Sequence, residues 1–175
     1  SPAEVRALGV SHVPEDRLAA GVVPAMTVAE NLLLGREMRF TRGLAFDRST
    51  VRAHARERIE AFDVRPPDAD AELEALSGGN QQKVVLAKWR SGGSDIILLD
   101  HPTRGLDIGA KEDVYEMIRE MSDAGVGIVL VADTLEEAIG LSHTIIVIKD
   151  GVFQKRFDGR PGSKPSLYDL VHHMI

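Results

Sequence analysis

Two stretches of the chain carry residue types that can bind phosphate groups. The first is LSGGNQQKVVLAKW, residues 76–89, in which Ser77, Gly78 and Gly79 stand where a helix is expected to begin. The free N–H groups and the positive dipole end of a helix start attract anions, and glycines let an anion approach the backbone closely. Ser77 adds a hydroxyl donor. The alternative is that these three residues only cap the helix and give it a flexible start.

The second stretch is DIILLDHPTRGLD, residues 95–107. Its apolar run, IILLD at 96–100, predicts a parallel strand that is buried on both faces. Asp100 then lies at the carboxyl end of the strand, where ligands bind in open α/β sheets. A carboxylate at that point can hold Mg²⁺, directly or through water, beside a nucleotide. The alternative is that Asp100 only caps a loop.

The elements that must position these residues fall into two groups. Residues 91–175 alternate strand and helix, as an α/β core does, with a second buried strand at 127–132 and a hairpin at 144–157 that turns at Asp150-Gly151. A strand at 7–13 joins this group. Residues 18–90 are mostly helix and loop. We therefore expect an α/β core from residues 1–17 and 91–175, with a helical insertion at 18–90.

Capping patterns and periodicity place the helices. Thr27 with Glu30 and Thr134 with Glu137 predict capping boxes for two short helices. Apolar spacing predicts three longer helices, at 47–62, 79–90 and 110–124, and a short one at 166–175. Residues 35–47 are expected to be irregular, and SGGSD at 91–95 to end the helix before it.

Composition excludes several classes of protein. The 175 residues are 43% hydrophobic and 27% charged, which is typical of a globular domain, and the net charge of −6 gives no global attraction to nucleic acid. The absence of cysteine excludes disulfides and cysteine-ligated metals. No apolar run approaches the length of a membrane span, and the first ten residues do not form a signal peptide.

The two phosphate-binding stretches together resemble the signature and Walker B segments of an ATP-binding-cassette (ABC) ATPase. VPEDR at 13–17, TVAENLLLG at 27–35 and PTRGLDIGAK at 102–111 are similar to the second nucleotide-binding domain of monosaccharide importers of the ribose, xylose and galactose types. The resemblance is clear over roughly residues 1–155. It implies a partial RecA-like ABC core with a helical signature subdomain, in an energy-coupling subunit at the cytoplasmic face of the membrane.

The resemblance also implies roles for single residues. The signature residues would contact ATP held by a second nucleotide-binding domain, in the same chain or in a dimer mate; they are Ser77, Gly78, Gly79 and Gln81. Asp100 would be the Walker B acid on the Mg²⁺ side, Asp107 the D-loop acid at the domain interface, and Glu15 the residue at the Q-loop glutamine position. The further partners implied are membrane permease subunits and, indirectly, a solute-binding protein, with no nucleic acid.

The sequence departs from the family pattern at three points. The phosphate loop G-x-x-x-x-G-K-[ST] is absent, so we expect a C-terminal portion of one nucleotide-binding domain that is inactive alone. His101 stands where the family carries a catalytic Glu, and Asp133 stands at the position of the switch histidine. We therefore expect this half's own ATP site to hydrolyse poorly, while its signature completes a competent site on the other half. A neutral imidazole can also accept a proton, so His101 substituting for Glu stays open.

Two other functions stay open at this stage. One is a non-catalytic regulatory or interaction module built on a degenerate ABC half, which His101 and Asp133 favour. The other is a DNA-associated ABC ATPase of the coiled-coil type, but it needs long heptads, which the sequence lacks, and the acidic charge disfavours it.

Overall fold

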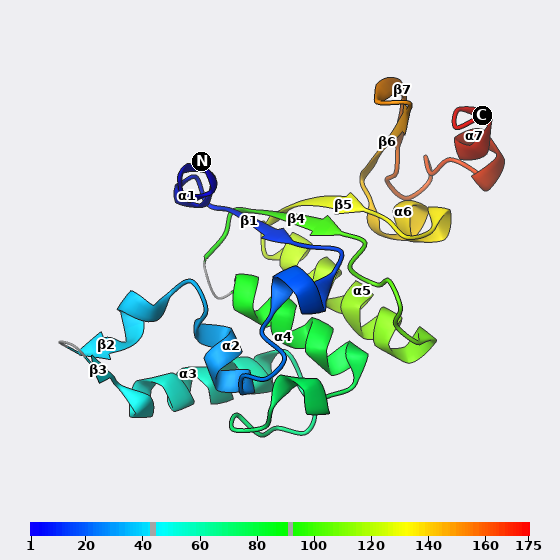
Figure 1. The fold of residues 1–175 in the computed structure, drawn as a ribbon. Helices are drawn as coiled ribbons and strands as arrows, with labels where there is room; N and C mark the ends of the chain where they lie inside the picture. The colour runs from blue at the N-terminus through cyan, green and yellow to red at the C-terminus, as the bar shows by residue number, and fades with distance from the viewer. Residues whose placement is uncertain (43–44, 91–92) are drawn as a thin grey trace. The chain divides into compact units, whose positions relative to one another are not determined.

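The computed structural model describes residues 1–42, 45–90 and 93–175 of the chain (Figure 1). It divides into two compact units, Ser1–Val129 and Leu130–Ile175, and each is described by itself. The expected α/β class is confirmed, because a parallel sheet and packed helices form the larger unit.

The larger unit begins with a short helix and a strand and continues through the helical part of the chain. Its first elements are α1 (Pro2–Ala7), β1 (Val10–Val13), the π-helical turn η1 (Arg17–Gly21), α2 (Val28–Leu33), the 3₁₀ turn η2 (Glu37–Phe40), β2 (Thr41–Arg42) and β3 (Ala45–Phe46). The remainder are α3 (Arg48–Ala61), the 3₁₀ turn η3 (Leu73–Ala75), α4 (Gly78–Arg90), β4 (Ile96–Asp100), α5 (Ile108–Asp123) and β5 (Gly127–Val131), whose last two residues belong to the second unit.

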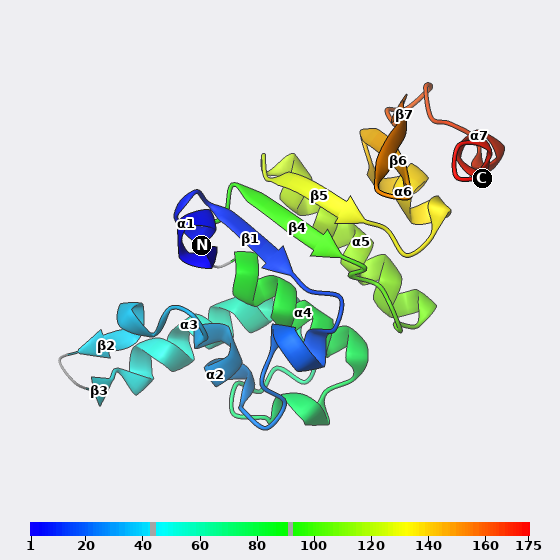
Figure 2. The ribbon, with the colours of Figure 1, turned by 45° about the horizontal axis from the view of Figure 1, so that its top comes forward.

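The main sheet has the strand order β1-β4-β5. β1 and β4 are parallel, in a register that pairs Val10 with Ile96 and Val13 with Leu99 (Figure 2). Because parallel strands end at the same edge of a sheet, the segments that follow them, 14–17 and 101–107, emerge side by side. The sheet thus brings together two of the motifs found in the sequence.

The prediction that β4 is buried on both faces is wrong. Ile97 and Leu99 are each 1% exposed, but Ile96 and Leu98 on the opposite face are 41% and 36% exposed. The second predicted buried strand, β5, alternates between exposed and half-buried residues. The reason is that α4 and α5 lie on one side of the sheet in the larger unit (Figure 1), so its apolar run is covered from that side.

Several predicted boundaries also change. Residues 2–7 form α1, so the strand expected at 7–13 begins only at Val10. The stretch expected to be irregular, 35–47, contains η2 and the short antiparallel pair β2–β3. A turn, η1, occupies part of the loop after β1. Of the SGGSD segment expected to end α4, residues 91–92 lie outside the described residues.

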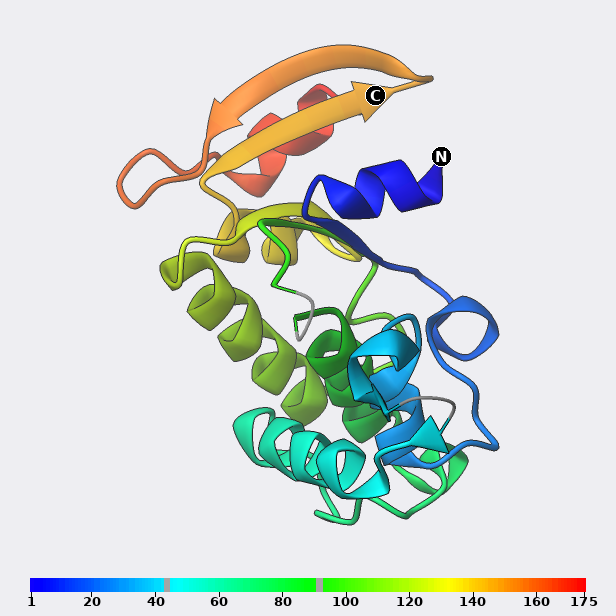
Figure 3. The same ribbon diagram turned by 90° about the vertical axis from the view of Figure 1, so that its left-hand side faces the viewer.

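The helices of the larger unit confirm the capping and periodicity arguments. Thr27 and Glu30 form the full capping box of α2. Ala55 and Ile59 are buried on α3, and Asp47 caps its start. On α5, the predicted apolar face is buried; its buried members are Val114, Met117, Ile118 and Met121. Figure 3 shows α3 (teal) and α4 (green) gathered below the sheet with α5 (yellow-green) beside them.

The second unit is a hairpin with two short helices, α6 (Leu135–Leu141) and α7 (Leu167–His172). The hairpin strands, β6 (Thr144–Lys149) and β7 (Val152–Asp158), turn at Asp150 and Gly151 as predicted, both with positive φ, 51° and 74°. Leu170 of α7 packs on Ile145 and Val147 of β6, so the red helix lies along the orange hairpin in Figure 3.

The capping box predicted for α6 is only half formed. The Thr134 hydroxyl accepts the N–H of Glu137, but the Glu137 carboxylate accepts the N–H of Asp133, at 2.9 Å, one residue before the cap. Within the described ranges, no helix is both long and apolar enough to cross a bilayer.

We expect Asn31 to be critical for the helical part. Its side chain is fully buried, accepts the Val23 N–H at 2.8 Å, and donates to the carbonyls of Val23, Met26 and Thr27 at 3.0–3.2 Å. Asn31→Leu removes the acceptor of the Val23 N–H and the three hydrogen bonds to carbonyls, although each carbonyl also accepts a backbone N–H, and it should lower the free energy of unfolding by about 2–4 kcal/mol in chemical denaturation.

Gln82 provides the matched control for Asn31. It is 2% exposed, and its Nε2 has no hydrogen-bond partner among the residues that the structure describes. Gln82→Leu should therefore change the free energy of unfolding by less than about 1 kcal/mol. Equal losses for the two variants would contradict this account of buried amides.

His54 should make the stability of the larger unit pH-dependent. Its ring lies 5.0 Å from the ring of Phe40. Burial lowers the pKa of His54 from 6.5, and three arginines lower this pKa further against the opposing effect of Glu57; they are Arg58, Arg36 and Arg39. The folded state thus favours neutral imidazole, so its contribution to stability is lost as the pH falls below about 6.5. His54→Gln should flatten the dependence of unfolding free energy on pH between about 7 and 5. Identical slopes in both proteins would contradict this.

Candidate functional site

Three motifs that are far apart in the sequence meet at the edge of the sheet where β1 and β4 end. The Glu15 carboxylate, after β1, pairs with the guanidinium of Arg104, after β4. Arg17 donates through Nε to Gln81 Oε1 on α4 and through Nη1 to the carbonyl of Arg104, each at 3.4 Å. These contacts join the VPEDR segment, the signature segment and the segment after β4.

The start of α4 presents a hydroxyl and backbone donors at the surface. Ser77 is exposed, and Gly78 and Gly79 are half-buried. Ser77 Oγ accepts from Asn80 Nδ2 at 2.9 Å, and the carbonyl of Ser77 accepts the Gln81 N–H, also at 2.9 Å. A hydroxyl that accepts a hydrogen bond still has its own hydrogen to donate. Ser77 can therefore cap α4 and donate to an external anion at the same time.

Packing requires a glycine at position 79 and leaves little space beside Gly78. A Cβ at Gly79 would lie 2.7 Å from Cβ of Ala110 on α5, and one at Gly78 would lie 2.9 Å from Nη2 of Arg17. At both positions, the direction in which a side chain would extend leads into a neighbouring part of the fold. This requirement was missed by sequence reasoning, which assigned the glycines only to anion approach or to a flexible helix start.

An ion pair between the buried Lys83 and the exposed Asp113 joins α4 to α5. Lys83 is 6% exposed, and its Nζ lies 2.8 Å from Oδ2 of Asp113 and donates to the carbonyl of Asp63 at 3.2 Å. Gly79 and Lys83 are four residues apart, so they lie on one face of α4, and Ala110 and Asp113 share the facing side of α5. Sequence reasoning missed this pair, because its two partners lie 30 positions apart on different helices.

Gln81 points into the fold. It is 7% exposed, and its Nε2 donates to the carbonyl of Leu76 at 3.0 Å and of Leu73 at 3.4 Å, while its Oε1 accepts from Arg17. In the structure Gln81 therefore holds the chain before α4 in place. The contact with ATP that the resemblance implies for this residue stays a prediction.

Asp100 is the last residue of β4, and the segment after it ends at Asp107. Asp100 is half-buried at the end of the strand. His101 has a positive φ of 44° and starts a turn in which its carbonyl accepts the Arg104 N–H at 3.1 Å. Asp107 is exposed and caps α5, because its Oδ1 accepts the Ala110 N–H at 2.9 Å. The cap starts α5 at Ile108, two residues earlier than predicted.

The remaining predicted site residue, Asp133, belongs to the second unit. It is exposed, and its backbone N–H is bound by Glu137 as described above. The larger unit thus brings together the residues predicted around the signature, the Q-loop position and the D-loop. Arg17 and Arg104 are further functional candidates, because they connect these motifs. Sequence reasoning did not single them out within the longer motifs that contain them.

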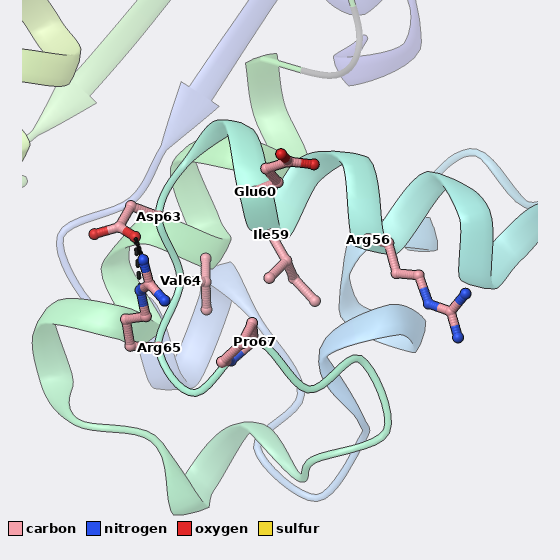
Figure 4. Close-up of a pocket in the computed structure, with 7 residues that line it drawn as sticks. All are labelled: Arg56, Ile59, Glu60, Asp63, Val64, Arg65 and Pro67. Atoms are coloured by element: carbon pink, nitrogen blue, oxygen red, sulfur yellow. Dashed lines mark hydrogen bonds and ion pairs between the residues drawn. The ribbon is translucent and has the colours of Figure 1, made fainter.

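A hollow of about 300 Å³ lies away from this edge, between the end of α3 and the segment that follows it (Figure 4). Asp63 and Arg65 on its rim form an ion pair at 2.6 Å. None of the predicted site residues lines the hollow. The hollow is therefore not part of the candidate site.

The residues at this edge fit a nucleotide bound with Mg²⁺. The start of α4, a helix of 13 residues, offers exposed donors for phosphate, and Asp100 offers a half-buried carboxylate at a strand end. Over the described parts of the chain, no group of three or more His, Asp or Glu side chains could hold a metal ion by itself. The magnesium contact of Asp100 stays a prediction from the sequence.

Known proteins share both the sequence and the fold. The family described as ABC transporter matches residues 3–104. The ribose import ATP-binding protein RbsA 1 of Rubrobacter xylanophilus is 40% identical over 86% of this chain and 30% of its own length. The arabinose import ATP-binding protein AraG of Pseudomonas syringae pv. tomato is 39% identical over 98% of this chain and 34% of its own length. The chain thus spans about a third of these relatives.

Two solved structures have the same architecture. The dimeric structure of MJ0796, a bacterial ABC transporter cassette, matches with a TM-score of 0.73 and 26% identity, over 90% of this chain and 66% of that one. A dimeric post-hydrolysis state of the same cassette, bound to ADP and Pi, matches with a TM-score of 0.70 over 86% of this chain and 63% of that one. The resemblance inferred from the sequence is confirmed: this chain belongs to the ABC transporter family.

Proposed function

We propose that the chain is the signature-bearing part of an ATP-binding subunit that couples ATP hydrolysis to the import of sugars or similar small solutes. The observation that carries this proposal is the exposed start of α4, where Ser77 and the amides that follow it are held in place from two sides. The sugar-import relatives, which match 86–98% of this chain, support the solute class.

The signature residues would act on ATP held by a second nucleotide-binding domain. The Ser77 hydroxyl and the N–H groups of Gly78 and Gly79 would donate to its phosphate oxygens, aided by the positive end of the α4 dipole. Charge-assisted hydrogen bonds of this kind gain strength when a second surface excludes water. The dimeric state of the matched cassette structures supports such a pairing.

This half's own site would hydrolyse slowly. Asp100 would hold Mg²⁺, which when bound neutralises charge on the phosphates. His101 would then have to orient or deprotonate water without the negative charge of a carboxylate. Asp133, at the switch position, would repel the γ-phosphate where a histidine would donate to it. The two active sites of the assembled ATPase would therefore be unequal.

The partners that follow are the second nucleotide-binding domain, permease subunits and, indirectly, a solute-binding protein, with the subunit peripheral at the cytoplasmic face of the membrane. Glu15 and Asp107 would lie at its interfaces. We also propose the division into a core, residues 1–17 and 91–175, and a helical subdomain, 18–90. A second candidate function is a non-catalytic regulatory module, which the residues His101 and Asp133 favour.

Ser77→Ala tests the contact with ATP. In the transporter assembled with its permease, loss of this donor should lower kcat/KM for ATP by about 10- to 100-fold. Ser49→Ala is the matched control, because Ser49 also lies in the first turn of a helix of the larger unit, at the end of α3 that follows β3. Thermal unfolding of both variants separates loss of a helix cap from loss of a ligand contact. An unchanged ATPase rate in Ser77→Ala would contradict the proposal.

His101→Glu tests the unequal sites. With the other site disabled, this variant should hydrolyse ATP at least about tenfold faster than the parent, since a positioned general base is worth about 10²–10⁴ in rate. Adding Asp100→Asn should abolish the gain, because Mg²⁺ would lose its carboxylate. If His101→Glu gives no gain and the parent site already turns over at the rate of its partner site, the proposed inequality is wrong.

A further inference from the structure

The turn η1 lies along one face of the signature helix. Gln81, Val85 and Lys88 of α4 are spaced i, i+4 and i+7, so they share a face. Arg17 at the start of η1 contacts Gln81, and Lys88 Nζ donates to the carbonyl of Gly21 at the end of η1, at 2.8 Å. Between them, a Cβ on Gly21 would lie 3.5 Å from Cγ2 of Val85. The turn therefore contacts α4 from its first turn to its last.

The turn itself is fixed by local hydrogen bonds. The Asp16 carboxylate accepts the N–H groups of Leu18 and Ala19, at 3.1 and 2.9 Å. The carbonyl of Arg17 accepts the Val22 N–H at 3.0 Å. These bonds hold the backbone from which the Arg17 side chain extends.

Each nitrogen of the Arg17 guanidinium faces a different neighbour. Nε donates to Gln81 Oε1, Nη1 donates to the carbonyl of Arg104, and Nη2 occupies the space beside Gly78, 2.9 Å from where a Cβ would stand. The planar fork of arginine can reach these points together. The single ammonium of lysine cannot, because its donors diverge from one atom.

We infer that Arg17 is a positioning residue that holds the first turn of α4 against the segment after β4. The side chain bridges Gln81, at the start of the signature helix, and the backbone of Arg104, three residues before Asp107. Glu15 adds a second link to the same segment through its ion pair with the Arg104 side chain. Displacement of the VPEDR segment thus displaces the donors at Ser77–Gly79 and the cap of α5 together. Any effect of Arg17 on ATP hydrolysis rests on the proposed function, whereas its role in positioning the start of α4 does not.

Hydrogen exchange of single amides tests the positioning in this chain. Arg17→Gln should speed exchange of the Gln81 and Gln82 amides by about five- to tenfold through local opening, while Val85 and Leu86 in the buried middle of α4 keep their rates. Arg17→Lys should give a smaller acceleration. Arg52→Gln is the matched control, because Arg52 forms an exposed ion pair with Asp70 at 3.2 Å and should leave all four amides unchanged.

A second background tests whether Gln81 carries the effect. In Gln81→Leu, Arg17→Gln should accelerate exchange at Gln82 by less than twofold, since the shared bond is already lost. Unchanged exchange in Arg17→Gln, or an equal acceleration at all four amides, would overturn the inference. Since Ser77→Ala tests ATP contact separately, a normal ATPase rate in that variant would refute the proposed function, while exchange alone still decides the role of Arg17.

Discussion

The structure of the larger unit depends on how closely α4 approaches α5 and η1. On one face of α4, Gly79 lets the helix meet Ala110, and the ion pair between Lys83 and Asp113 joins the two helices one turn further along. On another face, Gln81 and Lys88 bind the two ends of η1. A Cβ at position 79 would stand 2.7 Å from Ala110, so α4 cannot keep this position with any other residue there. Gly79 is therefore required for the packing of α4, and this packing holds the donors at the start of α4 in place.

This packing explains how one edge can collect motifs from distant parts of the chain. Parallel pairing of β1 with β4 brings the segments after both strands to the same edge. The packing of α4 then places the signature start beside them, and Arg17 and Glu15 connect all three through Gln81 and Arg104. A surface built in this way suits a partner that brings its own ligand, because the donors are exposed but their backbone is fixed.

Local features of the fold were predictable from sequence. The capping box at Thr27, the buried face of α5 and the Asp150-Gly151 turn follow from contacts within a few residues, and each is present in the structure. The burial of β4 was not predictable, because it depends on which elements cover each face of the sheet. The sequence pattern assigned the Glu137 carboxylate to the N–H of Thr134, but the carboxylate accepts the N–H of Asp133, one residue earlier, and residue spacing alone does not distinguish the two. At the candidate site, motif spacing located Ser77, Asp100 and Asp107, but the bonds of Arg17 join residues 64 and 87 positions apart, and such contacts leave no periodicity.

The central claim is that the start of α4 donates to a nucleotide brought by another domain. Amide chemical shifts of Gly78 and Gly79, followed by NMR, test it most directly, with Mg²⁺-ATP added to this chain alone and then together with a nucleotide-binding domain that carries a phosphate loop. The account predicts no shift with Mg²⁺-ATP alone and clear shifts of both glycine amides when the second domain and ATP are both present. Shifts of these amides with Mg²⁺-ATP alone, or no shift under either condition, would contradict it.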